Sequence, residues 1–143
     1  MWLRNSSRRD TAVLADLYRF MSDRFLHTNK VSLDILDQES GVESGGFAEK
    51  NKPTNGYPSS VTVWVTGDNR TFPYNNVFEG FSTVLYSWEE EFLLVLAHEL
   101  RHIDQFYGTV PEFFEKDAES YAINTLQAYR VFVQTQVQMK RAA

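Results

Sequence analysis

The segment from Ser87 to Gly108 constrains the fold of this chain more than any other part of it. Ser87 and Glu90 form a capping box at its start, and Gly108 is a typical residue at a helix C-terminus. Apolar side chains occupy almost every direction around the helix between them, so most of its surface has to be buried. We therefore expect this helix to run through the core, with the rest of the chain packed around it.

Two histidines and a glutamate interrupt this apolar helix in the pattern HExxH. His98 and His102 are four residues apart, so both imidazoles lie on one face and can bind a single tetrahedral zinc ion. Glu99 lies one step further around the helix, where it faces a water in the open fourth position. Burying these polar groups without a function would be costly. The motif predicts a zinc-dependent hydrolase in which the metal activates the water and Glu99 is the general base.

The helix that follows offers carboxylates for a third zinc ligand. Thr109 and Pro111 predict its start. Glu115 projects into the apolar sector of this helix, Glu119 lies at the border of that sector, and Asp117 points about a quarter turn beyond the opposite border. Glu115 and Asp117 are the two candidates for the third ligand, and the sector favours Glu115 because a carboxylate on a buried apolar face needs a cation beside it. The residues of the apolar sector, which has to face the core, are Ala118, Ala122, Leu126, Tyr129 and Val133.

HExxH followed by a helix that reads ExxA[DE] resembles the gluzincin-type zincin metallopeptidases. The matching residues are His98, Glu99, His102 and the run EKDAE from Glu115 to Glu119. The resemblance implies that His98, His102 and Glu115 bind the zinc ion. It implies that Glu99 is the general base and that Glu119 orients a ligand histidine. The implied activity is zinc-dependent hydrolysis of peptide bonds in a peptide or protein substrate.

The first part of the chain reads as a helix followed by strands. Ser7 and Asp10 form a capping box ahead of apolar residues at helical spacing, which predicts an opening helix. Alternating apolar and polar residues predict strands over 31–35 and 61–66. The Gly-, Ser-, Asn- and Pro-rich residues 37–60 between them predict a long mobile loop.

Residues 71–86 are less regular. Pro73 limits the first part to an edge position, and we expect Phe81–Tyr86 to be extended. The sequence Gly67-Asp68-Asn69 predicts a turn. Residues 136–143 at the end of the chain are expected to fray.

The resemblance also implies the fold, an α+β zincin-like minimal metallopeptidase domain that spans residues 1–143. We expect a small, mostly antiparallel sheet between about Val31 and Tyr86, with the HExxH helix packed against it. The closing helix would carry the third ligand. In zincins the substrate commonly pairs with the edge strand of the sheet, and the resemblance offers Val61–Thr66 or Phe81–Tyr86 for this position.

The composition of the chain limits the kinds of ligand that it can bind. The chain has 143 residues, 43% of them hydrophobic and 23% charged, which suits one globular domain. A net charge of -5 argues against nucleic acid as a ligand. The absence of cysteine means that a metal has to be held by histidine and carboxylates. No signal peptide or membrane span is evident, which predicts a soluble, cytoplasmic protein; the oligomeric state is not predicted.

Other readings of the same residues stay open. The chain is small, so it could be a metal-holding but catalytically silent zincin-like interaction module, or a structural protein with an accidental motif. Tyr107 and Tyr121 could stabilise an oxyanion, although packing roles are favoured for both. Arg101 and the glutamates 89–91 are expected on exposed turns, and His27 is expected to cap a helix end.

Overall fold

The chain builds a four-stranded sheet in the order β1-β2-β4-β3, and the alternating apolar residues lie in its two middle strands. Its middle strands are β2 (Val31–Asp37) and β4 (Ser59–Val65), and its edges are β1 (Trp2–Asn5) and β3 (Gly45–Glu49). β1, β2 and β4 run parallel, and β3 is antiparallel to β4. The α+β class is confirmed; where a mostly antiparallel sheet was expected, the four-stranded sheet is mixed, with two parallel pairings and one antiparallel pairing.

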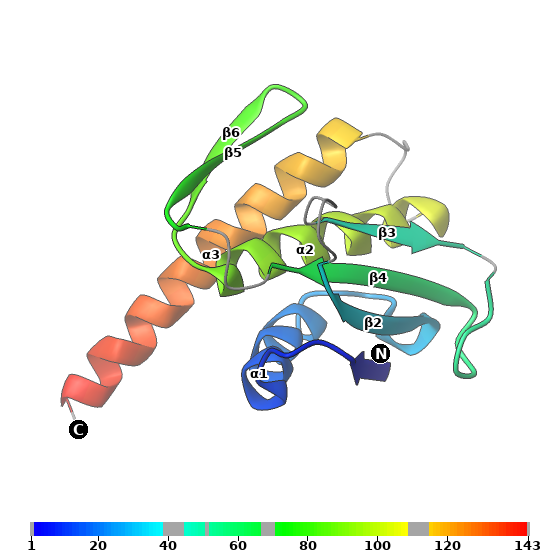
Figure 1. Ribbon diagram of the computed structural model, residues 1–143, viewed down its shortest axis with the longest axis horizontal. Helices are drawn as coiled ribbons and strands as arrows, with labels where there is room; N and C mark the ends of the chain where they lie inside the picture. The colour runs from blue at the N-terminus through cyan, green and yellow to red at the C-terminus, as the bar shows by residue number, and fades with distance from the viewer. Residues whose placement is uncertain (1, 39–44, 51, 67–70, 109–114, 143) are drawn as a thin grey trace.

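The computed structural model describes residues 2–38, 45–50, 52–66, 71–108 and 115–142 (Figure 1). The expected turn at Gly67–Asn69 and the expected helix start at Thr109 and Pro111 lie outside these residues.

Helix α1 (Thr11–Ser22) connects β1 to β2 and supplies the crossover that a parallel pair of strands needs. Its N-cap is Asp10, whose side chain accepts hydrogen bonds from the backbone nitrogens of Ala12 and Val13. Ser7 was expected in that role and does not fill it. The helix begins later than the sequence suggested because the Asp10 carboxylate satisfies two of the free N–H groups.

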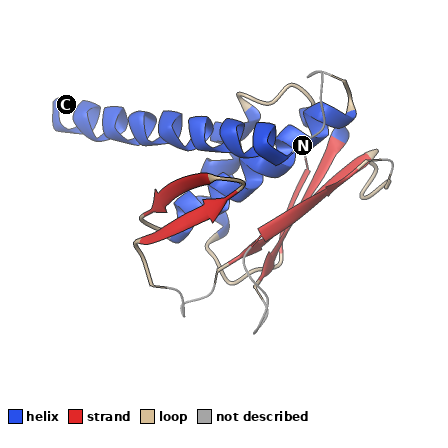
Figure 2. Ribbon diagram, turned by 90° about the horizontal axis from the view of Figure 1, so that it is seen from above, coloured by secondary structure: helices blue, strands red, loops and turns tan. Residues whose placement is uncertain are grey.

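Helix α2 (Trp88–Phe106) runs through the core, as expected. The Ser87 side chain accepts from the backbone nitrogen of Glu90, and Gly108 follows the helix at a positive φ of 71°. The sheet packs on one side of α2, and α3 (Glu115–Ala142) packs on the other (Figure 2). This sandwiched position explains why α2 is apolar nearly all round.

β5 (Tyr74–Phe78) and β6 (Phe81–Leu85) form a hairpin that is separate from the four-stranded sheet. Glu79 and Gly80 connect them with φ angles of 50° and 82°, as a type I′ turn requires. The single sheet expected from Val31 to Tyr86 is therefore two sheets. Figure 1 shows the hairpin beside α3, above the four-stranded sheet.

Two segments that were expected to be irregular contain regular secondary structure. The proposed loop over 37–60 contains β3 and the beginning of β4 within its described residues. The residues expected to fray, 136–143, are helical as far as Ala142, although their side chains are exposed. None of the helices in the described part of the chain is long and apolar enough to cross a membrane.

Candidate metal centre

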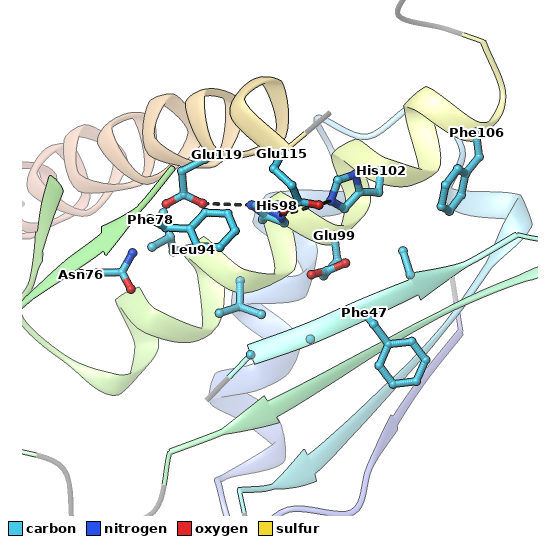
Figure 3. Close-up of a pocket in the computed structure, with 14 residues that line it drawn as sticks. Phe47, Asn76, Phe78, Leu94, His98, Glu99, His102, Phe106, Glu115 and Glu119 are labelled. Carbon is cyan, nitrogen blue, oxygen red and sulfur yellow. Dashed lines mark hydrogen bonds and ion pairs between the residues drawn. The ribbon is translucent and has the colours of Figure 1, made fainter. Parts of the chain in front are cut away.

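Helices α2 and α3 bring three possible ligands to one point (Figure 3). The ligand atoms of His98, His102 and Glu115 all lie within 4.8 Å of one another. His98 Nε2 is 3.0 Å from one Glu115 oxygen, and His102 Nε2 is 3.0 Å from the other. The two Nε2 atoms are 3.2 Å apart. The candidate ligands named from the sequence thus converge.

The opposite nitrogen of each imidazole has an acceptor beside it. His98 Nδ1 is 2.9 Å from Glu119 Oε2, and His102 Nδ1 is 2.7 Å from Gln105 Oε1. Because carboxylate and amide oxygens only accept, each Nδ1 donates. In the neutral imidazoles, the lone pair of each Nε2 therefore points to the space that they share with Glu115.

This arrangement fits a divalent cation. Two imidazole lone pairs and a carboxylate at about 3 Å repel one another unless a proton or a cation lies among them. The set of two neutral imidazoles and one carboxylate matches the ligands that catalytic zinc takes. Burial opposes the charged form of His98, but its hydrogen bond to Glu119 and the charges of Glu99 and Glu115 outweigh this and raise its pKa.

The sequence predicted a role for Glu119 but not for Gln105. Glu119 was expected beside a ligand histidine, and the structure places it there, 4% exposed. Gln105 was not singled out. Its position three residues after His102, on the same helix face, was the available signal. The Gln105 amide donates to Asp117 at 2.9 Å, which turns its oxygen toward His102.

Glu99 lies beside the cluster without belonging to it. Its carboxyl group lines the same pocket as His98 and His102, on the side that faces β3 (Figure 3). Burial is the main cause that raises the pKa of Glu99 to about 7; His98 acts in the opposite direction and Glu115 adds to the rise. The carboxyl group is thus placed to exchange a proton with a molecule in the pocket.

The pocket has a volume of about 410 Å³, within the range of small-ligand sites. β3 forms one wall and the β5–β6 hairpin forms another, through Asn76 and Phe78. The Phe78 ring packs edge-on against His98 at 5.4 Å, with an interplanar angle of 76°. Leu94 and Phe106 line the pocket along α2. Apolar side chains thus surround the polar groups of His98, Glu99 and His102 in the pocket.

The edge strand beside this pocket is β3, which was not expected to be a strand. β4, which contains most of the proposed Val61–Thr66, pairs with a strand on each side and is not an edge. β6, the other candidate, pairs with β5 in the hairpin. Neither is the edge strand of the four-stranded sheet.

Asp117, the rival third ligand, points elsewhere. Its two carboxylate oxygens accept from Arg101 Nε at 2.8 Å and from Arg101 Nη2 at 3.1 Å. The Arg101 guanidinium is the main cause that holds the pKa of Asp117 below its usual range. Arg101 was expected on an exposed turn, but it is half-buried between Asp117 and the ring of Tyr121, 4.9 Å away.

The glutamates at the start of α2 were also expected to be exposed. Glu91 is buried, and the Tyr74 hydroxyl donates to it. Glu90 accepts from Arg130 Nη2 at 2.8 Å and from Arg130 Nε at 3.0 Å. These carboxylates hold neighbouring elements to α2.

The remaining candidates contact residues that do not line the pocket. The Tyr107 hydroxyl hydrogen-bonds Ser59 at 2.7 Å, and Tyr121 lies under Arg101. Neither tyrosine lines the pocket in the described part of the chain. His27 makes no side-chain cap hydrogen bond; its Nε2 lies 3.6 Å from Asp104 Oδ1, and its ring packs on Tyr107.

Comparison with known proteins adds no relative: the chain matches no protein-family model, no curated protein and no solved structure.

Proposed function

We propose that this protein is a zinc-dependent metallopeptidase of the gluzincin type. One observation carries the proposal. His98, His102 and Glu115 offer ligand atoms within 4.8 Å of one another, and Glu99 lines the same pocket. The hydrogen bonds from Nδ1 of both histidines to Glu119 and Gln105 support it, because they leave Nε2 for a cation.

His98, His102 and Glu115 would hold the metal. When bound, a zinc ion supplies a Lewis acid that lowers the pKa of a water and polarises the substrate carbonyl. Two imidazoles and a carboxylate do not by themselves exclude cobalt or nickel.

Glu99 carries the proton in this proposal. Its carboxylate accepts a proton as the water oxygen attacks the carbonyl carbon of the scissile peptide bond. The C–N bond then breaks, and Glu99 delivers that proton to the leaving nitrogen. The products are a carboxylic acid and an amine, and Glu99 is again a carboxylate.

The substrate would be an extended peptide lying along β3. β3 is an edge strand, so the backbone groups on its outer side can pair with an added chain. The hairpin residues Asn76 and Phe78 would bound the groove opposite. A peptide held there would pass over Glu99 and the three proposed ligands.

The decisive experiment measures metal content and peptide hydrolysis separately. Purified protein is expected to contain one zinc ion per chain by mass spectrometry of the metal, and His98→Ala and His102→Ala are expected to lose it. Glu99→Gln should keep the zinc and lose about two or more orders of magnitude of hydrolysis of a peptide library. Unchanged metal content in both histidine variants would overturn the proposal.

A metal-holding, catalytically silent module is the second candidate. Phe78 packs against His98 and narrows the pocket beside the proposed metal, which favours this reading. Zinc-loaded protein that cleaves no member of the peptide library, with or without the Glu99→Gln substitution, would identify it.

A further inference from the structure

The last three turns of α3 project from the body of the molecule, which they contact near their start, where the Phe132 ring lies 5.4 Å from that of Phe20 (Figure 1). Every residue from Val131 to Ala142 in this segment is exposed, over a length of about 18 Å. Large apolar side chains are nevertheless frequent in it. They are Val131, Phe132, Val133, Val137 and Met139, with exposures of 63%, 43%, 39%, 43% and 62%.

Val133 and Val137 extend the stripe by which α3 packs on the core. At about 100° per residue, they fall in the same sector as Ala122 and Leu126, which are completely buried. The apolar stripe thus continues about three helical turns beyond Leu126, the last residue of α3 that is buried. An exposed apolar face of this kind marks an interaction surface.

Unpaired charges of opposite sign lie at the two ends of this face. Lys140 and Arg141 are at the far end, and neither makes an ion pair within the described residues. At the near end, Arg130 of α3 pairs with Glu90 at 2.8 Å, which places the first turn of α2, with Glu89 in it, beside α3. Glu89 makes no ion pair with a described residue. The face therefore has an unpaired acidic residue where it leaves the body and two unpaired basic residues at its tip.

These charges set a register for a second copy of the same helix. Counted from residue 135, Tyr129 and Arg141 each lie six residues away, or about 9 Å. Two such helices packed antiparallel about this centre would place the basic tip of each beside Glu89 of the other. The same register sets Val133 of one copy against Val137 of the partner subunit.

We propose that the exposed face of α3 pairs antiparallel with a second copy of this chain to form a two-fold dimer. Three helical turns bury less than the roughly 800 Å² per partner of a standard interface, so the dimer is reversible and depends on concentration. The proposal is independent of the metal site.

Sedimentation velocity over a range of protein concentrations tests the apolar part. Val137→Asp is expected to weaken the dimer at least about tenfold, because it puts a carboxylate at the centre of the contact. Val131→Asp is the matched control, since Val131 is more exposed and lies on the opposite side of the helix. A monomer at every concentration, or equal effects of the two variants, would overturn the proposal. Circular dichroism confirms that each variant keeps its helices.

Charge reversal tests the register. Glu89→Lys alone, and Lys140→Glu with Arg141→Glu, should each weaken the dimer, and the combination of all three should restore it. A dimer that the reversals leave unchanged would overturn this arrangement. A monomeric protein that binds anionic lipid vesicles through α3 would likewise contradict it and point to a membrane surface instead.

Discussion

At the scale of single residues, Gly46 sets how closely β3 approaches the candidate site. A Cβ atom at this position would lie 2.6 Å from the Thr62 carbonyl oxygen and 3.1 Å from both Glu99 Cγ and Val95 Cγ1. Only glycine lets this strand lie against α2 at the level of Glu99. The proposed general base is therefore packed against a backbone rather than against a side chain.

Gly46→Ala should destabilise the protein and displace Glu99. We expect the free energy of unfolding to fall by about 1–3 kcal/mol, as for other overpacked interiors. Hydrolysis should fall, while zinc content is kept because the three ligands lie on other elements. Urea denaturation, metal analysis and peptide assays measure these effects. Gly45→Ala is the control, since a Cβ there meets nothing within 4 Å; equal stability of the two variants would contradict the expectation.

Glu115 and Asp117 are distinguished by their effect on zinc affinity. Glu115→Ala removes a proposed ligand, so zinc affinity should fall by more than the roughly 10–100-fold that loss of an outer hydrogen-bonding partner costs. Asp117→Ala removes the partner of Arg101 and should stay below that range. Competition titration with a chromophoric chelator gives both constants. The reverse order would make Asp117 the ligand.

At the scale of elements, the sequence predicted where a strand lies better than it predicted which strands pair and in which direction. Alternating valines marked β4, but alternation does not say whether a neighbour runs parallel or antiparallel. β3 was missed because Gly45 and Gly46 carry no side chains that could alternate, and its strand conformation depends on pairing with β4. β1 has only four residues, too few for a periodic signal. α2, by contrast, could be predicted with its cap because its signals are local.

The Arg130–Glu90 ion pair connects α3 to the start of α2, and Arg130 also donates to the Val84 carbonyl of β6 at 2.6 Å. Burial would raise the pKa of Glu90, but hydrogen bonds from Arg130 and from the Tyr86 backbone lower it below its ordinary value. A carboxylate with a lowered pKa in the folded state stabilises the protein above its unfolded pKa. That contribution is lost as the pH falls through the folded pKa.

Arg130→Ala should therefore lower the free energy of unfolding by about 1–3 kcal/mol at pH 7, the range for hydrogen bonds to charged groups. The difference from the unmodified protein should shrink as the pH falls below about 4.3. Urea denaturation at several pH values measures it. Arg19→Ala is the matched control, because the Arg19–Asp16 pair is largely exposed and should contribute less than about 1 kcal/mol. A difference that is constant from pH 7 to pH 3 would contradict this assignment.

At the scale of the whole molecule, two short-range rules were enough to find the proposed ligands. The i, i+4 spacing placed His98 beside His102, and the apolar sector of α3 placed Glu115 toward them. Phe78 and Gln105 escaped notice for different reasons. Phe78 reaches the pocket only because the hairpin folds over α2, and Gln105 acts through a hydrogen bond that no motif encodes.

Zinc should stabilise the folded chain because the ligands come together only when α2 and α3 pack. At free zinc about 100-fold above the dissociation constant, the free energy of unfolding should rise by about 2.7 kcal/mol. Thermal melts with zinc and with a chelator measure the difference. His98→Ala should melt at the same temperature under both conditions. Identical melting of the unmodified protein with zinc and with chelator would count against the site.

The separation of the hairpin from the four-stranded sheet has a mechanical consequence. The two walls of the groove belong to different hydrogen-bonded units, β3 to the sheet and Phe78 to the hairpin. Their spacing is therefore set by side-chain packing and not by strand pairing. The groove can widen or narrow around molecules of different thickness without breaking the ladder hydrogen bonds of either unit.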